Sequence, residues 1–231
     1  MKSYTNDLKL IFNKLKSKES FSFSKYADGE YAILRNIPIT NCDGWTFDPV
    51  KHSEEQNLLL ESFKYKHENY HVGIMCPCCN PMNGVQWMRD TVKTKNLTWA
   101  NLFVNNNYPF FREYFFPEFN NWSGRVVLMG NEQGINKKLP FKCNVFYPIS
   151  IGAWINPKLT KTIKTFIKLA EEESNQLFLF SAGPLGNILA HQLHLVNPNN
   201  TYLDIGSTIN PWLTNNNRGY LNGLDQKTCI W

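Results

Sequence analysis

Apolar and polar residues alternate along the chain in patterns that predict helices and strands in turn. Where apolar residues recur every three or four positions, as in residues 5–16 and 158–173, the pattern predicts an amphipathic helix. Pro38 is expected to end one short helix, and an aromatic-rich stretch is expected to form another that packs on the core. The predicted helices are residues 31–34, 53–65, 110–119 and 187–195, in addition to the two above.

Short apolar and β-branched runs predict buried strands between these helices. The predicted strands are residues 21–24, 71–75, 125–130, 144–149, 177–180 and 201–206, with a further apolar segment at 99–104. Residues 177–206 read strand, glycine turn, helix, strand, which is a βαβ unit and is typical of parallel sheets covered by helices. Since no linker or repeat interrupts the chain, residues 1–231 are expected to form a single Rossmann-like α/β domain with a mostly parallel sheet flanked by helices.

Composition narrows the class of protein. Hydrophobic residues make up 42% and aromatic residues 14% of the 231 residues, which predicts a folded chain and excludes disorder. The formal net charge is +5, but the basic residues are dispersed, so anionic ligands are expected and nucleic acid is not. Residues 1–18 predict a lysine-rich amphipathic helix without the features of a signal peptide, and no apolar run approaches ~18 residues. The sequence therefore predicts a cytoplasmic protein with no membrane span.

Six cysteines are present, and only three of them are clustered, in the CPCC motif of residues 76–79. A zinc-finger pattern needs a second Cys/His pair at matching spacing, and the sequence has none. The pattern favours ordinary buried or surface thiols over a soft-metal site. His191 and His194 lie three apart on a predicted helix and are likewise expected to be packed or solvated.

The candidate chemistry begins with an acidic pair directly after the first predicted strand. Asp28 and Glu30 carry hard oxygen ligands, and Gly29 between them lets the backbone approach a bound group. This spacing suits a divalent cation that also holds a diphosphate. The same three residues also fit a plain turn and the first turn of a helix, where acids are favoured by the helix dipole.

Other polar groups follow the later predicted strands, and the carboxyl ends of parallel strands are where open α/β sheets collect ligands. Gly183 opens a helix whose free amides can receive a phosphate, or it simply makes the turn. Asp204 is a candidate general base or second metal ligand, or a cap for the following turn. The candidates at these strand ends are Asn131, Glu132, Gly183, Pro184, Asp204, Gly206 and Ser207.

Two further groups are candidate ligand contacts. Arg218 can clamp a diphosphate through paired hydrogen bonds, or form a surface ion pair. Asn107 and Tyr108 are candidate substrate contacts, and several aromatic side chains can stack on a sugar or a base, namely Trp45, Trp99, Tyr108 and Trp212. The sequence has no dinucleotide-binding Gly-x-Gly-x-x-Gly, no Walker loop and no Gly-x-Ser-x-Gly elbow, so nicotinamide cofactors and serine hydrolysis are unsupported.

Three motifs occur in order along the chain, FSKYADGE at residues 23–30, FSAGPLGNILA at 180–190 and YLDIGS at 202–207, and together they resemble the D-type fold (GT-D) glycosyltransferases. Residues 23–30, FSKYADGE, are similar to the family's R-F/Y-G-D-G-E start, whose Asp-x-Glu (DXE) motif binds a divalent metal and the donor diphosphate. Residues 180–190, FSAGPLGNILA, look like its Gly-Pro turn and helix, and residues 202–207, YLDIGS, look like its closing Asp-Ile-Gly strand. The resemblance spans about residues 20–220. Lys25 and Ala27 replace the usual arginine and glycine, and Ser207 stands where many members have a histidine.

The resemblance implies a metal-dependent, hexosyltransferase-type enzyme of glycan biosynthesis that moves a sugar from a nucleotide-sugar to a glycan or glycoprotein hydroxyl. UDP is the expected nucleotide. It implies Asp28 and Glu30 as ligands of Mn²⁺ or Mg²⁺, with the donor site continued by Gly29, Asn131, Gly183, Pro184, Ser207 and Arg218. Glu132 and Asp204 are the candidate catalytic bases, and an oligomer is compatible with the sequence. Two alternatives stay open: a hydrolase that uses the same metal with water as acceptor, and a non-catalytic nucleotide-sugar-binding domain.

Overall fold

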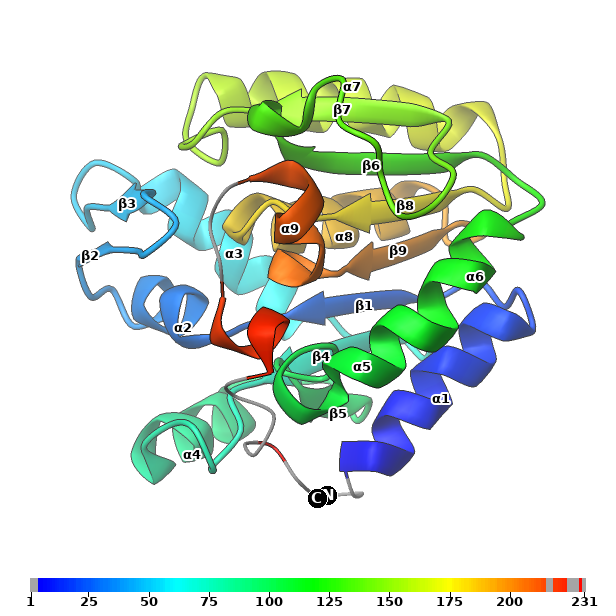
Figure 1. Cartoon of the computed structure of the whole chain (residues 1–231). Helices are drawn as coiled ribbons and strands as arrows, with labels where there is room; N and C mark the ends of the chain where they lie inside the picture. Colours follow the sequence, from blue (N-terminus) through cyan, green and yellow to red (C-terminus); the bar gives the residue numbers. More distant parts are fainter. Residues whose placement is uncertain (1–3, 215–217, 224–228, 230–231) are drawn as a thin grey trace.

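One seven-stranded sheet organises the molecule, in a computed structural model that describes residues 4–214, 218–223 and 229. The strands are ordered β5-β4-β1-β9-β8-β6-β7, and every pairing within this sheet is parallel. Their bounds are β1 Ser22–Lys25, β4 Tyr70–Ile74, β5 Leu97–Trp99, β6 Val126–Asn131, β7 Val145–Ile149, β8 Leu177–Phe180 and β9 Thr201–Asp204. The arrows therefore all point to one edge of the sheet (Figure 1).

Helices cover both faces of this sheet (Figure 1). One face carries α1 (Tyr4–Lys16), α5 (Tyr108–Phe110) and α6 (Phe116–Asn120), and the other carries α3 (Ser53–Lys64), α7 (Lys158–Glu172) and α8 (Pro184–Val196). The remaining helices are α2 Asp28–Leu34, α4 Met82–Thr91 and α9 Asn210–Leu213, and β2 Ile39–Thr40 and β3 Thr46–Phe47 form a separate antiparallel pair. The short 3₁₀ helices are η1 Asn105–Asn107, η3 Glu132–Gly134, η4 Gly206–Ile209 and η5 Gly219–Asn222, and η2 Phe111–Phe115 is a π-helix between α5 and α6.

The central strands carry unbroken apolar runs because both of their faces are covered. All four residues of β8 are buried, and β8 lies between β6 and β9. On one face an aromatic layer joins α1 to the helical stretch from α5 to α6: the ring centroid of Phe12 lies 5.7 Å from that of Phe110 and 5.4 Å from that of Phe115. This layer confirms the prediction that the aromatic stretch packs on the core.

The sheet order creates a crevice at its carboxyl edge. From β1 the chain moves outward to β4 and β5, whereas β9 enters beside β1 from the opposite half of the sheet. Ligands of open α/β proteins bind at such a reversal of direction. Phe180 pairs with Asp204 and with Met129, so β6, β8 and β9 end at a similar level.

The predicted fold class is confirmed, and the differences are local. Helix α4 was not predicted. The apolar segment expected at 99–104 is a strand only up to Trp99, and residues 41–49, for which no strand was predicted, contain β3. Strands β2 and β3 have only two residues each, which is too short for an alternating pattern to be recognised in the sequence. Among the described residues, no helix is both long and apolar enough to cross a bilayer.

Candidate functional site

A cavity of about 660 Å³ opens at the carboxyl edge of the sheet. Its walls come from the ends of β1, β6, β8 and β9, from the β2–β3 loop, from residues 149–154 and from the segment around Arg218 and Tyr220. Most of the polar groups predicted at strand ends therefore meet in one place. A more open groove of about 650 Å³ runs along α7 and contains none of the predicted site residues.

The acidic pair lies in the first turn of α2, and both residues line the cavity. Asp28 is exposed, whereas Glu30 is buried and its Oε2 accepts a hydrogen bond from the backbone N–H of Ala27 at 2.9 Å. Burial raises the pKa of Glu30, Lys25 opposes this shift, and the charge of Asp28 adds to it. Two carboxylates that are close enough to repel one another provide the kind of site that a hard cation can occupy.

A metal at this pair would need ligands beyond the two carboxylates. In the part of the chain that the structure describes, no third Asp, Glu, His or Cys joins Asp28 and Glu30 in a cluster. Mg²⁺ and similar ions are commonly held by one or two carboxylates together with substrate phosphates and water. The residues therefore fit a cation that arrives with a diphosphate.

Gly29 lines the cavity and also lies against the β2–β3 loop. A Cβ on this residue would lie 2.9 Å from Asn41 Nδ2 and 2.9 Å from the Trp45 ring, so the space beside Gly29 is filled by the β2–β3 loop. Gly183 meets the same indole: its φ is +55°, and a Cβ there would lie 3.3 Å from Trp45 Nε1. Two glycines thus allow Trp45 to close over the helix starts of α2 and α8.

Trp45 forms an aromatic pair with Trp154 on the cavity wall. Their ring centroids are 5.8 Å apart in an edge-to-face arrangement, and both residues line the cavity. Of the four aromatic residues predicted as stacking partners, only Trp45 is among the residues that line it. Trp154 was missed, because nothing in the local sequence distinguishes it from a core tryptophan.

Glu30 also belongs to a cluster of charges with Lys25, which is half-buried, and Asp204, which is buried. Burial lowers the pKa of Lys25, but attraction to Asp204 and Glu30 outweighs this effect and the net shift is upward. Burial raises the pKa of Asp204 to about 7, against the opposing effect of Lys25. Gly206, with φ +52°, makes room for the lysine, since a Cβ there would lie 2.8 Å from Lys25 Nζ and still closer to its Cε.

Arg218 lines the cavity and is engaged within the protein. Its Nη2 donates to both carboxylate oxygens of Asp43 at 2.5 Å, and its Nη1 donates to Cys42 Sγ at 3.1 Å. Close by, the hydroxyls of Ser207 and Tyr220 are hydrogen-bonded to one another. The ion pair that the sequence left open as an alternative for Arg218 is therefore present, at the cavity wall.

Several predicted site residues do not line the cavity. Glu132 is exposed although its neighbours Asn131 and Gln133 line the wall, and Asp204 is buried with its Oδ1 accepting from the N–H of Gly206 at 3.0 Å. Pro184 is buried at the start of α8. Asn107 and Tyr108 are also buried, and the Tyr108 hydroxyl donates to the backbone carbonyl of Thr208 at 2.9 Å.

The positions of Asn107 and Tyr108 differ from the expectation that they contact substrate. The asparagine-rich stretch does reach the cavity, but through Asn105 and the nearby Asn101. The turn η1 rotates successive side chains to different sides, and sequence alone did not fix which asparagine faces inward. Other wall residues that the sequence did not single out are Asn41, Asp43 and the 149–154 segment.

Two solved structures share the fold of this chain. A solved structure described as the selenomethionine-substituted domain of unknown function 1792 has a TM-score of 0.57 and 15% sequence identity, covering 91% of this chain and 79% of that chain. A second solved structure is described as the highly conserved domain of unknown function 1792 with a distinct glycosyltransferase fold. Its TM-score is 0.54 at 13% sequence identity, and the match covers 91% of this chain and 84% of that chain.

No protein-family model matches the chain, and no curated protein matches it. At 13–15% identity the two structures establish the fold alone. The chain thus has the architecture that has been described as a distinct glycosyltransferase fold, in agreement with the resemblance of its three motifs.

Proposed function

We propose that this chain is a hexosyltransferase-type glycosyltransferase that moves a sugar from a nucleotide-sugar to a hydroxyl of a glycan or glycoconjugate. UDP is the proposed nucleotide. The observation that carries the proposal is that the acidic pair after β1 and the glycine turn before α8 line one cavity, at the strand edge where this fold class binds ligands. The volume of about 660 Å³ lies within the range of small-molecule sites.

Asp28 and Glu30 would hold Mn²⁺ or Mg²⁺ together with the donor diphosphate. When bound, the cation neutralises the negative charge that develops on the leaving diphosphate as the sugar is transferred. Lys25 adds a fixed positive charge next to Glu30, and the N-terminal end of α8 adds the positive end of a helix dipole beside Gly183.

The tryptophan pair and Arg218 would position the donor. Trp45 and Trp154 offer apolar ring faces and edges of the kind on which a uracil or a sugar packs. Arg218 is held at the wall by Asp43 and can contribute to the diphosphate site from there. Ser207 and Asn131 add a hydroxyl and an amide to the same wall.

The proton of the acceptor hydroxyl must go to a base within hydrogen-bonding reach of it. The two predicted bases, Glu132 and Asp204, stay predictions, and neither side chain lines the cavity. Among the described residues, the carboxylates that line it are those of Asp28, Glu30 and Asp43. Asp204 instead attracts the charge of Lys25, which suits a residue that positions the lysine.

Calorimetric titration with UDP, with and without Mn²⁺, tests the metal site. We expect Mn²⁺ to strengthen UDP binding to the wild-type protein and to have little effect on Asp28→Asn, because the variant loses a charged ligand but keeps the helix start. Asp90→Asn is the matched control, since Asp90 is exposed on α4 away from the cavity. Equal metal dependence in the wild type and Asp28→Asn would exclude Asp28 as a ligand.

A panel of UDP-sugars with glycan acceptors then separates the possible activities. Transfer to an added glycan supports the glycosyltransferase, release of free sugar without transfer indicates the hydrolase, and metal-dependent binding without turnover indicates a binding domain. Retention of transfer by Asp28→Asn at the wild-type rate would contradict the mechanism.

A further inference from the structure

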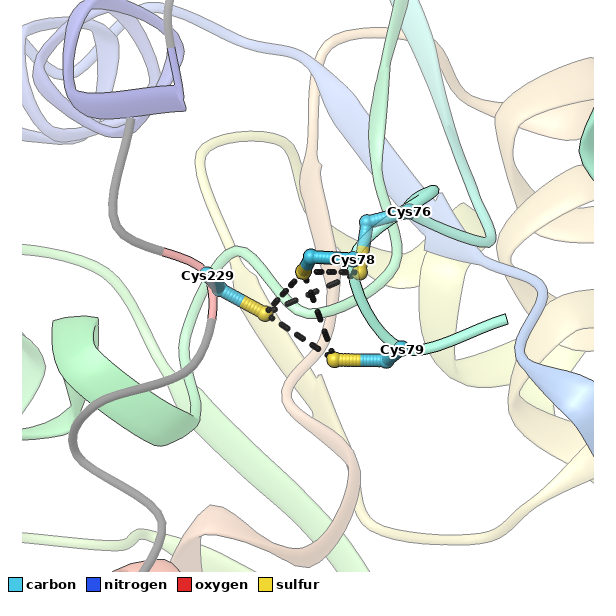
Figure 2. Close-up of side chains that lie close together, drawn as sticks. All are labelled: Cys76, Cys78, Cys79 and Cys229. Carbon is cyan, nitrogen blue, oxygen red and sulfur yellow. Dashed lines mark hydrogen bonds between the residues drawn. The ribbon is translucent and has the colours of Figure 1, made fainter. Parts of the chain in front are cut away.

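Three cysteine side chains of the CPCC motif and a fourth from far along the chain converge (Figure 2). Cys76 follows β4, Cys78 and Cys79 lie in the loop that leads to α4, and Cys229 comes from the far C-terminal part of the sequence. The four Sγ atoms all lie within 4.8 Å of one another. Figure 2 shows all four sulfur atoms directed toward a common centre.

The separations between the sulfur atoms match a single tetrahedral ion. Sγ of Cys78 lies 3.3 Å from that of Cys76, 3.4 Å from that of Cys79 and 3.4 Å from that of Cys229. Sγ of Cys229 lies 3.6 Å from that of Cys76 and 3.5 Å from that of Cys79. A tetrahedron with zinc–sulfur bonds of about 2.3 Å has edges of about 3.8 Å, whereas a disulfide requires about 2.05 Å.

Polar neighbours complete the surroundings of these sulfur atoms. Asn105 Nδ2 donates to Cys229 Sγ at 3.3 Å, and Asn101 Nδ2 donates to Cys76 Sγ at 3.4 Å. Amide donors of this kind stabilise thiolates and orient them around a metal. Cys76 and Cys229 are buried while Cys78 and Cys79 are exposed, so an ion has a route in from solvent.

Without a cation these four groups cannot all be thiolates. Negative charges on sulfur atoms only 3.3–3.6 Å apart would repel one another strongly. Zn²⁺ removes that restriction: as four zinc–sulfur bonds form, the thiols lose their protons to solvent and the ion takes a closed Cys₄ shell.

We propose that Cys76, Cys78, Cys79 and Cys229 bind one Zn²⁺ ion in a structural site that fastens the C-terminal part of the chain to the loop after β4. All four coordination positions are filled by protein, which is typical of structural rather than catalytic zinc. The site borders the cavity, since Cys79, Asn101 and Asn105 also line its wall. Its soft thiolate ligands separate it chemically from the carboxylate pair of Asp28 and Glu30.

Metal analysis of the full chain, purified under reducing conditions without chelator, tests the proposal directly. We expect one zinc per chain, and we expect Co²⁺ added to the metal-free protein to give the charge-transfer and d–d absorption bands of tetrahedral thiolate coordination. A wild-type protein that binds neither ion at one per chain would overturn the proposal. So would iron together with inorganic sulfide in place of zinc, or a disulfide among these four cysteines.

Cys229→Ser identifies the fourth ligand, and Cys143→Ser is the matched control. Cys143 lies on the opposite half of the sheet, where its thiol donates to backbone carbonyls, as a serine also can. We expect Co²⁺ binding to Cys229→Ser to weaken by more than the roughly 10–100-fold that loss of an outer-shell partner costs. An affinity for Co²⁺ in Cys229→Ser equal to that of the wild type would refute the four-cysteine site. The Asp28→Asn protein should keep its zinc even if it no longer binds UDP, so the two proposals can fail separately.

Discussion

At the scale of single residues, the candidate site depends on a cluster of three ionisable side chains, two of them buried and one half-buried. Lys25, Glu30 and Asp204 lie near one another where β1 and β9 end. Burial works against the charged form of each, and mutual attraction between the lysine and the two acids works for it. Such a cluster gives the site a fixed electrostatic environment before any ligand arrives.

The cluster predicts an unusual pH dependence of stability. The pKa of Asp204 is about 7 in the folded protein and near 3.8 in an unfolded chain, so between these values the folded state holds more protons. Asp204 therefore contributes its whole stabilisation of the folded state below pH 3.8, and this stabilisation is lost as the pH rises through about 7. Because the asparagine amide does not ionise, the change Asp204→Asn should remove this loss.

Urea unfolding of the wild type and Asp204→Asn, at pH 5 and pH 8 with divalent cations removed, measures the effect. We expect the stability of Asp204→Asn relative to the wild type to rise by about 2 kcal/mol between the two pH values, since one pKa unit corresponds to about 1.4 kcal/mol. The exposed Asp90→Asn should show no such rise. A constant difference between Asp204→Asn and the wild type would mean that Asp204 has an ordinary pKa.

At the scale of secondary-structure elements, α8 is fastened to the end of β1. The side-chain Nδ2 of Asn187, which is fully buried, donates to Ser24 Oγ at 3.0 Å and to the backbone carbonyl of Lys25 at 2.6 Å. This contact fixes the glycine turn before α8 relative to the acidic pair after β1. This one side chain thus links two motifs that lie far apart in the sequence.

Replacing Asn187 with alanine should destabilise the protein even though alanine favours helices. The carbonyl of Lys25 and the hydroxyl of Ser24 would lose a buried donor, and we expect a loss of about 2 kcal/mol in urea unfolding. Gln192→Ala, at a half-buried position of the same helix, is the control and should cost about 0.5 kcal/mol or less. Similar losses in both variants would show that the Asn187 hydrogen bonds are not a special link.

At the scale of the whole molecule, the cavity draws its walls from nearly the full length of the chain. Lys25 near one end and Arg218 near the other face the same space, together with segments that follow β6, β8 and β9. Unfolding any of these parts removes part of the wall. A ligand of the cavity is therefore expected to bind only the folded state and to stabilise all of it.

Calorimetric melting with UDP and Mn²⁺ tests this coupling. At a UDP concentration of about 100 times its dissociation constant, the folded state should gain about 2.7 kcal/mol, seen as a rise in Tm. Mn²⁺ alone and UDP with chelator are the controls, and each should give a smaller rise. If Tm did not change at a UDP concentration that saturates binding in the titration, UDP would not bind selectively to the folded state.

The sequence predicted the architecture because burial on both faces of a parallel strand leaves an unbroken apolar run. Residues 125–130 and 177–180 are such runs, and both are central strands. Helix α4 and the β2–β3 pair were missed, because neither has a strong periodic pattern. The acidic pair and the glycine turn before α8 were found from local motifs at strand ends, which the parallel topology then brought to one edge.

Side-chain direction and long-range partners depended on the tertiary structure. Asn107 and Tyr108 were expected to contact substrate, but the helical turn buries them and turns Asn105 to the cavity instead. Gly29 leaves room for the ring of Trp45, which comes from the β2–β3 loop. These outcomes are set by neighbours distant in sequence, which no local spacing records.

The CPCC motif illustrates the same division. Sequence alone determined that three thiols lie in one loop and that no second pair stands at zinc-finger spacing. Only the folded chain brings Cys229 to within 3.6 Å of Cys76, across 153 positions of sequence. Local pattern thus decided the strands, their burial and the acidic pair, because these depend on hydrophobicity and neighbouring residues. Tertiary packing decided which distant side chains meet, because that depends on the closure of the whole sheet.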